Sequence, residues 1–150
     1  MRNAFTVDVE DYFQVEGFAK VIDRSAWEGI RTRVGASTTT LLEMLAQRKI
    51  RATFFVLGWV ARKHPEIVHQ IAAAGHEVAS HGMSHRLVYT QTPEEFRRET
   101  HDAKALLAAL GGECATPDEL ASRTGMATPR VALAVIELER TGWIERSRGA

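Results

Sequence analysis

The segment that most constrains this chain is His81-Gly82-Met83-Ser84-His85, in which two imidazoles lie four residues apart. It directly follows residues 76–80, His-Glu-Val-Ala-Ser, whose alternation is typical of a β-strand. A second strand-like run, residues 4–9, ends among three carboxylates, those of Asp8, Glu10 and Asp11. Imidazole and carboxylate groups are common ligands of divalent metals, so the sequence predicts a metal site where these two strands end.

A hydrolytic metal centre needs a few anchoring ligands, an open position for water and a base. His81 and His85 are candidates for two ligands, since their spacing suits either one helical turn or a loop that curls back. Asp8, Glu10 or Asp11 would supply a third ligand, and strand alternation places Asp8 and Glu10 on one face. A second carboxylate would then be available as a general base. An isolated His-x-x-x-His pair also fits two solvated side chains, and it is the position of both clusters after strands that favours the metal site.

Strand and helix patterns alternate over the first 110 residues. Strands are predicted at 4–9, 52–57 and 76–80, and helices at 39–48, 60–74 and 93–110. The segment 37–40 offers N-caps to the first helix, and residues 92–95 form a capping box at the start of the last one. The apolar face of the first helix is predicted to comprise Leu41, Leu42, Met44 and Leu45. This order predicts an α/β fold with a parallel sheet.

The composition excludes some kinds of metal site and gives no support for some kinds of binding partner. The 150 residues carry 19 basic and 19 acidic side chains, so bulk charge gives no argument for nucleic-acid or membrane binding. The single cysteine, Cys114, excludes an internal disulfide framework and a cysteine-rich zinc site. No apolar stretch has the length of a membrane span, and no signal-peptide core precedes the first strand, so the sequence predicts a soluble, cytoplasmic protein.

Three segments, in this order and spacing, resemble the polysaccharide deacetylases of carbohydrate esterase family 4, the NodB homology domain. They are residues 6–13 (Thr-Val-Asp-Val-Glu-Asp-Tyr-Phe), 52–59 (Ala-Thr-Phe-Phe-Val-Leu-Gly-Trp) and 75–85. The resemblance covers residues 4 to about 109 and is closest to the subfamily of exosortase and exopolysaccharide loci. It implies a distorted (β/α) barrel and metal-dependent hydrolysis of N-acetyl or O-acetyl groups on a polysaccharide or oligosaccharide.

The same resemblance implies roles for individual residues. Asp8 would be the catalytic base, and His81 and His85 would be metal ligands, with zinc the expected metal. Glu10 or Asp11 would be the metal-binding carboxylate, and this variant of the motif leaves the choice open. The family's later motifs, including the histidine that acts as general acid, have no counterpart after residue 110. This predicts a partial barrel, impaired activity, and unpaired strand edges through which copies could associate.

The predicted domains are 1–110, the deacetylase-like part, and 111–150, a small winged-helix module. The second segment is similar to the module that closes the DNA-processing protein A family. Arg123 and Arg130 are its candidate phosphate contacts, although five Arg against six Asp plus Glu from residue 113 onward do not favour nucleic acid. The alternative function is therefore a DNA-binding or protein-binding winged-helix protein with a relic deacetylase part.

Two aromatic residues are candidates for binding the glycan. Trp59, after Gly58, could stack on a sugar ring, although an apolar residue that opens a helix is more often part of the core. Tyr12 lies next to the carboxylates and could form a wall of the site, or equally pack in the core.

Overall fold

The computed structural model describes residues 4–111 and residue 129. Three short strands, β1 (Thr6–Val9), β2 (Thr53–Val56) and β3 (Glu77–Ser80), form a parallel sheet in the order β1-β2-β3. A parallel pair needs a crossover connection, and helices provide one between each pair of consecutive strands. The predicted α/β class with a parallel sheet is therefore confirmed.

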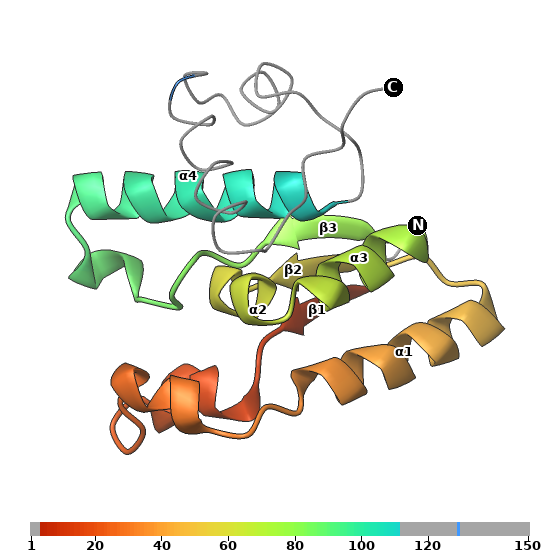
Figure 1. Cartoon of the computed structure of the whole chain (residues 1–150), viewed down its shortest axis with the longest axis horizontal. Helices are drawn as coiled ribbons and strands as arrows, with labels where there is room; N and C mark the ends of the chain where they lie inside the picture. Colours follow the sequence, from red (N-terminus) through yellow and green to blue (C-terminus); the bar gives the residue numbers. More distant parts are fainter. Residues whose placement is uncertain (1–3, 112–128, 130–150) are drawn as a thin grey trace.

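Four α-helices and four 3₁₀ helices complete the described part. The α-helices are α1 (Val34–Arg48), α2 (Gly58–Lys63), α3 (Pro65–Ala73) and α4 (Pro93–Leu110). The 3₁₀ helices are η1 (Tyr12–Gln14), η2 (Glu16–Phe18), η3 (Arg24–Gly29) and η4 (Val88–Thr90). In Figure 1, α4 lies on the β3 side of the sheet and α1 on the β1 side. Within the described residues, no helix has the length and apolar character needed to cross a membrane.

The core lies between the central strand and the helices that follow it. Phe54 and Val56 of β2 are fully buried, as expected for the middle strand of a parallel sheet. Many of the other buried apolar residues come from α2, α3 and α4, and include Val60, Ile67, Val68, Ile71, Leu106, Leu107 and Leu110. The same core cluster also contains Val9, Phe13, Trp27, Val34, Leu45, Ala52 and Leu57. Burial of apolar side chains is the main stabilising term in folding, so these residues hold α2–α4 against the sheet.

The first long helix differs from its prediction. It begins at Val34 rather than at residue 39, and the predicted N-caps at 37–40 lie inside it. The reason is a cap from a distant part of the sequence: Oδ2 of Asp11 accepts hydrogen bonds from the backbone N–H groups of Arg33 (2.5 Å) and Val34 (3.0 Å). Its other oxygen, Oδ1, accepts one from Tyr12 N (3.0 Å) at the start of η1. Local sequence could not indicate this start, because the capping side chain precedes the helix by more than 20 residues.

The apolar face of α1 differs from its prediction at one residue. Leu45 is buried and the partly buried Leu41 and Leu42 pack against the core as predicted, but Met44 is 54% exposed. The helix packs through the face that carries Val34, Thr38 and Leu45. Met44 is about 100° around the helix from Leu45, which places it toward solvent.

The last helix begins as predicted. Oγ1 of Thr92 accepts a hydrogen bond from Glu95 N (3.2 Å), and Oε2 of Glu95 accepts one from Thr92 N (2.9 Å). These two bonds form the predicted capping box, with Pro93 at the first helical position. The hydrogen bond from the Thr92 backbone lowers the pKa of the Glu95 carboxyl group below its usual value, and the nearby Arg86 guanidinium lowers it further.

We expect Asp11→Ala to lower the free energy of unfolding by about 3 kcal/mol. A lost N-cap costs about 1 kcal/mol, and a buried N–H group left without a partner costs about 1–3 kcal/mol. Urea denaturation of the metal-free chain measures the change. The matched control is Asp23→Ala, which removes the exposed carboxylate that caps η3 by accepting from Ser25 N (2.8 Å). A loss as large in the control as in Asp11→Ala would contradict the capping role inferred for Asp11.

We expect Glu95→Gln to remove a pH-dependent part of the stability. Because the folded pKa of Glu95 lies below its unfolded value, its contribution is present above about pH 4.5 and is lost as the pH falls through the folded pKa. Glutamine keeps a capping oxygen but does not titrate, so the stability difference between wild type and variant should shrink on acidification. Urea midpoints at neutral pH and at about pH 3 measure this difference. A difference that does not change with pH would contradict the interpretation.

Candidate metal centre

The register of the sheet brings two predicted ligands to the same edge. Val9 pairs with Val56, and Val56 pairs with Ser80, so these three residues form the last row of the sheet. Glu10 and His81 each follow that row by one residue and therefore emerge at the same level. The carboxyl ends of parallel strands are where α/β proteins collect functional groups.

The loop that carries both histidines is held by backbone hydrogen bonds. His81 N donates to Val56 O (3.0 Å), and the first N–H groups of α2 donate to the loop, Gly58 N to Gly82 O (2.8 Å) and Trp59 N to Met83 O (2.9 Å). Gly58 is required at this approach, because a Cβ there would overlap the Sδ atom of Met83 and lie 3.0 Å from its Cα. The pair is therefore carried by a loop that curls back, one of the two alternatives that its spacing allows.

The loop brings His85 back toward Glu10. His85 has a φ of 55°, in the left-handed region that non-glycine residues rarely adopt. Its Nε2 atom lies 2.9 Å from Oε2 of Glu10, and Nε2 of His81 lies 3.7 Å from the same oxygen. The two imidazole rings are edge-on, with centroids 5.1 Å apart. One ligand atom from each of Glu10, His81 and His85 lies within 4.8 Å of the other two.

These three residues fit a divalent cation. Two nitrogens and one carboxylate oxygen form a His-His-carboxylate set, which suits zinc and other first-row metals and leaves positions for water or substrate. Nε2 of His81 is buried and has no hydrogen-bond partner among the described residues, and the buried Oε2 of Glu10 has only the contact with Nε2 of His85 described above. Buried polar atoms are normally satisfied, so a cation that accepts both lone pairs accounts for their arrangement.

Asp11 is not part of this group. Both of its carboxylate oxygens accept backbone hydrogen bonds at the starts of η1 and α1, and its residue is 3% exposed. The sequence left Glu10 and Asp11 as alternatives for the metal carboxylate, and the geometry favours Glu10. Both oxygens of the Asp11 carboxylate are engaged in capping, so the choice of Glu10 over Asp11 as the ligand is taken forward as a proposal.

Asp8, the predicted base, lies within β1 opposite Phe55 in the register. Its side chain is exposed, whereas that of the next residue, Val9, is buried, as strand alternation requires. The described residues donate no hydrogen bond to its carboxylate. The role of Asp8 stays a prediction.

The two predicted glycan-binding aromatics have different surroundings. Trp59 is 7% exposed and packs edge-on against Phe13 and Trp27, with centroids 6.0 and 5.8 Å away. Its indole is therefore part of the core, the alternative that the sequence favoured, and its contact with a glycan stays a prediction. Tyr12 is 45% exposed, and the Arg33 guanidinium lies 4.9 Å from its ring centroid. The role of Tyr12 at the site stays a prediction.

The candidate phosphate contacts cannot be placed in the same way. Arg123 and Arg130 lie outside the described residues, as does the predicted winged-helix module.

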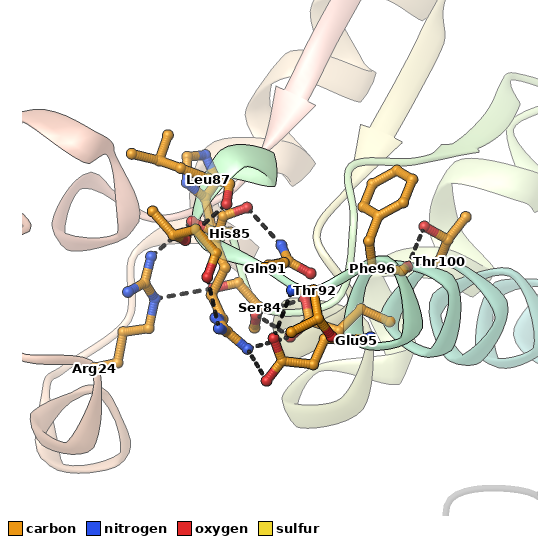
Figure 2. Close-up of polar contacts among 12 residues, drawn as sticks. Arg24, Ser84, His85, Leu87, Gln91, Thr92, Glu95, Phe96 and Thr100 are labelled. Carbon is orange, nitrogen blue, oxygen red and sulfur yellow. Dashed lines mark hydrogen bonds and ion pairs between the residues drawn. The ribbon is translucent and has the colours of Figure 1, made fainter.

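Two side chains that the sequence did not single out contact the histidine loop. Figure 2 shows Arg24 reaching the loop, where its Nε and Nη2 atoms donate to Ser84 O (3.1 Å) and His85 O (2.7 Å). Ser84 Oγ in turn donates to the Glu99 carboxylate of α4, 2.8 and 2.7 Å from its two oxygens. No local pattern could have revealed Arg24, because its partners lie about 60 residues further along the chain.

The chain is similar to proteins of a known family. A family model described as polysaccharide deacetylase matches residues 29–142. The chitooligosaccharide deacetylase of Rhizobium leguminosarum bv. trifolii is 36% identical over 72 residues, which are 48% of this chain and 34% of that protein. A peptidoglycan-N-acetylglucosamine deacetylase of Bacillus cereus is 36% identical over 75 residues, which are 50% of this chain and 27% of that protein. The chain thus spans about a third or less of these curated relatives.

A solved structure shows the same likeness in three dimensions. The Bc1960 peptidoglycan N-acetylglucosamine deacetylase superposes with a TM-score of 0.53 at 28% identity, over 73% of this chain and 41% of that one. The family match runs past residue 110, the boundary predicted between two domains, and that boundary stays a prediction. Because the family model covers well over half of the sequence, the chain belongs to the polysaccharide deacetylase family.

Proposed function

We propose that this chain carries the metal-binding half of a deacetylase that hydrolyses acetyl groups, as amides or esters, on a polysaccharide or oligosaccharide. The observation that supports this most directly is the convergence of Glu10, His81 and His85 at the carboxyl edge of the sheet, in a chain of this family. The relatives' names specify chitooligosaccharide and peptidoglycan substrates, so an N-acetylated glucosamine polymer is the substrate class that we infer.

The three donors would hold a divalent cation, and we propose zinc because two of the ligands are imidazoles. A cation held there supplies Lewis-acid chemistry, which polarises a carbonyl oxygen and lowers the pKa of water. The role of Glu10, His81 and His85 is to fix the position of this charge at the edge of the sheet. Asp8, two residues before Glu10, would accept the proton of the attacking water.

When an acetyl group is removed from an amide, the amine that leaves must receive a proton. The histidine that the resemblance implies as the donor has no match in this sequence. The family motif that carries the general-acid histidine has no counterpart after residue 110. We therefore expect the 150-residue chain to turn over slowly, even when its metal centre is loaded. The exosortase-locus subfamily, the winged-helix module and association through strand edges rest on sequence reasoning alone and stay predictions.

The first experiment measures metal binding. We expect the metal-free chain to bind one equivalent of zinc, and expect Glu10→Ala and His81→Ala/His85→Ala to weaken this binding by at least about a hundredfold, since each removes an inner ligand. Isothermal titration gives the stoichiometry and the affinity.

The matched control for Glu10 is its neighbour. Asp11→Asn removes a charge one residue away and keeps one capping oxygen, so zinc affinity should stay close to that of wild type while the free energy of unfolding falls. Zinc affinity that depends on Asp11 as strongly as on Glu10 would contradict the proposed ligand set.

The second experiment measures chemistry. Acetate release from an acetylated chitooligosaccharide should require zinc and should fall by about 10²-fold or more in Asp8→Asn, because a positioned general base contributes on the order of 10²–10⁴. Zinc affinity should change little in this variant, which separates the base from the ligands. Acetate release at the same rate in wild type and Asp8→Asn would show that another group takes the proton.

A further inference from the structure

We propose that Arg24 is a positioning residue for the metal ligand His85, an inference that rests on the proposed function. Its guanidinium donates from Nε to Ser84 O (3.1 Å) and from Nη2 to His85 O (2.7 Å). These two carbonyls belong to the peptide planes on either side of the Cα atom of His85. Fixing the directions of both planes fixes φ and ψ at His85, and with them the direction of its Cα–Cβ bond.

This restraint matters because His85 needs an unfavourable backbone conformation. Its φ of 55° places a non-glycine residue in the left-handed region, where the Cβ atom crowds the backbone. In a more common conformation the side chain would leave the loop in another direction, away from Oε2 of Glu10, which it now approaches to 2.9 Å. Some contact must therefore hold the loop in this form, and Arg24 contacts the two groups that define it.

Arg24 is itself held in place. It is the first residue of η3, which begins with a cap from Asp23, whose Oδ1 accepts from Ser25 N (2.8 Å). The Arg24 guanidinium also lies 5.8 Å from the ring centroid of Trp27, and Trp27 is 4% exposed and packs against Phe13. Because Phe13 follows Glu10 by only three residues, the same aromatic cluster supports the carboxylate side and, through Arg24, the histidine side of the centre.

The chemistry of the side chain suits this task. A guanidinium presents several N–H donors in a fixed plane, so one side chain can bind two neighbouring carbonyl oxygens at once. Lysine carries the same charge on a single rotating ammonium group and offers no such fork. Charge alone therefore does not account for the contact, and a lysine variant separates geometry from electrostatics.

The test uses the full chain and cobalt(II), whose visible spectrum reports the geometry of its ligands. We expect Arg24→Ala and Arg24→Lys each to weaken cobalt binding by about tenfold and to change the spectrum of the bound ion, as loss of a residue that orients a ligand does in other metal sites. The control is Lys63→Ala. Like Arg24, Lys63 places a cation beside the aromatic cluster, 4.7 Å from the ring centroid of Trp59, but its ion pair is with Glu28 and not with the histidine loop. Its cobalt affinity and spectrum should equal those of wild type.

A second measurement does not depend on the metal. Hydrogen exchange of the metal-free chain, followed in a peptide that spans residues 81–87, should be faster in both Arg24 variants than in wild type and Lys63→Ala. Unchanged exchange, or cobalt affinity in the Arg24 variants equal to that of Lys63→Ala, would overturn the proposal. Failure of wild type to bind cobalt or zinc would instead refute the proposed function, while the exchange rates would still decide whether Arg24 holds the loop.

Discussion

The parallel register of the three strands is the constraint on which the rest of this structure depends. Val9, Val56 and Ser80 form one row, and the residues that follow the two outer strands, Glu10 and His81, carry the donor atoms. A shift of one residue in either pairing would turn the outer strand's side chains to the other face of the sheet. The buried Phe54 and Val56 of the central strand oppose such a shift, because it would disturb their packing against the helices. The hydrophobic core thus sets the relative position of two polar residues that it does not contain.

Glu10 and Asp11 show how adjacent carboxylates acquire different roles. At the end of an extended segment, successive side chains point in opposite directions, so only one of the two can face the histidine loop. Glu10 takes that direction, and Asp11 accepts the N–H groups that open η1 and α1. Backbone donors at a helix start stabilise a buried carboxylate without a cation. The motif therefore couples the candidate metal centre to the placement of α1 through one peptide bond.

Much of the fold and part of the candidate site could be predicted because their signals are local. Alternation of apolar and polar residues predicts the three strands, and capping chemistry predicts the capping box at Thr92. The positions of the strand ends predict that a carboxylate lies near His81 and His85. The rest depends on contacts between distant residues. The start of α1 requires Asp11, and the packing of Trp59 requires Phe13 and Trp27. Nothing in the residues around any of these positions specifies such partners.

The histidine loop illustrates why the outer shell of a site is harder to predict than its ligands. A ligand is recognised by its chemistry, since few residue types donate to a divalent cation. A supporting residue is recognised only by its neighbours. The loop 81–85 is supported by residues 56–59, by Arg24 and by Glu99, from three separate parts of the chain. Most of these contacts are made to backbone atoms, which every residue has. These contacts bring the three donors together, and they hold His85 in its unfavourable backbone conformation. A cation that enters the site therefore need not supply the free energy of ordering the loop.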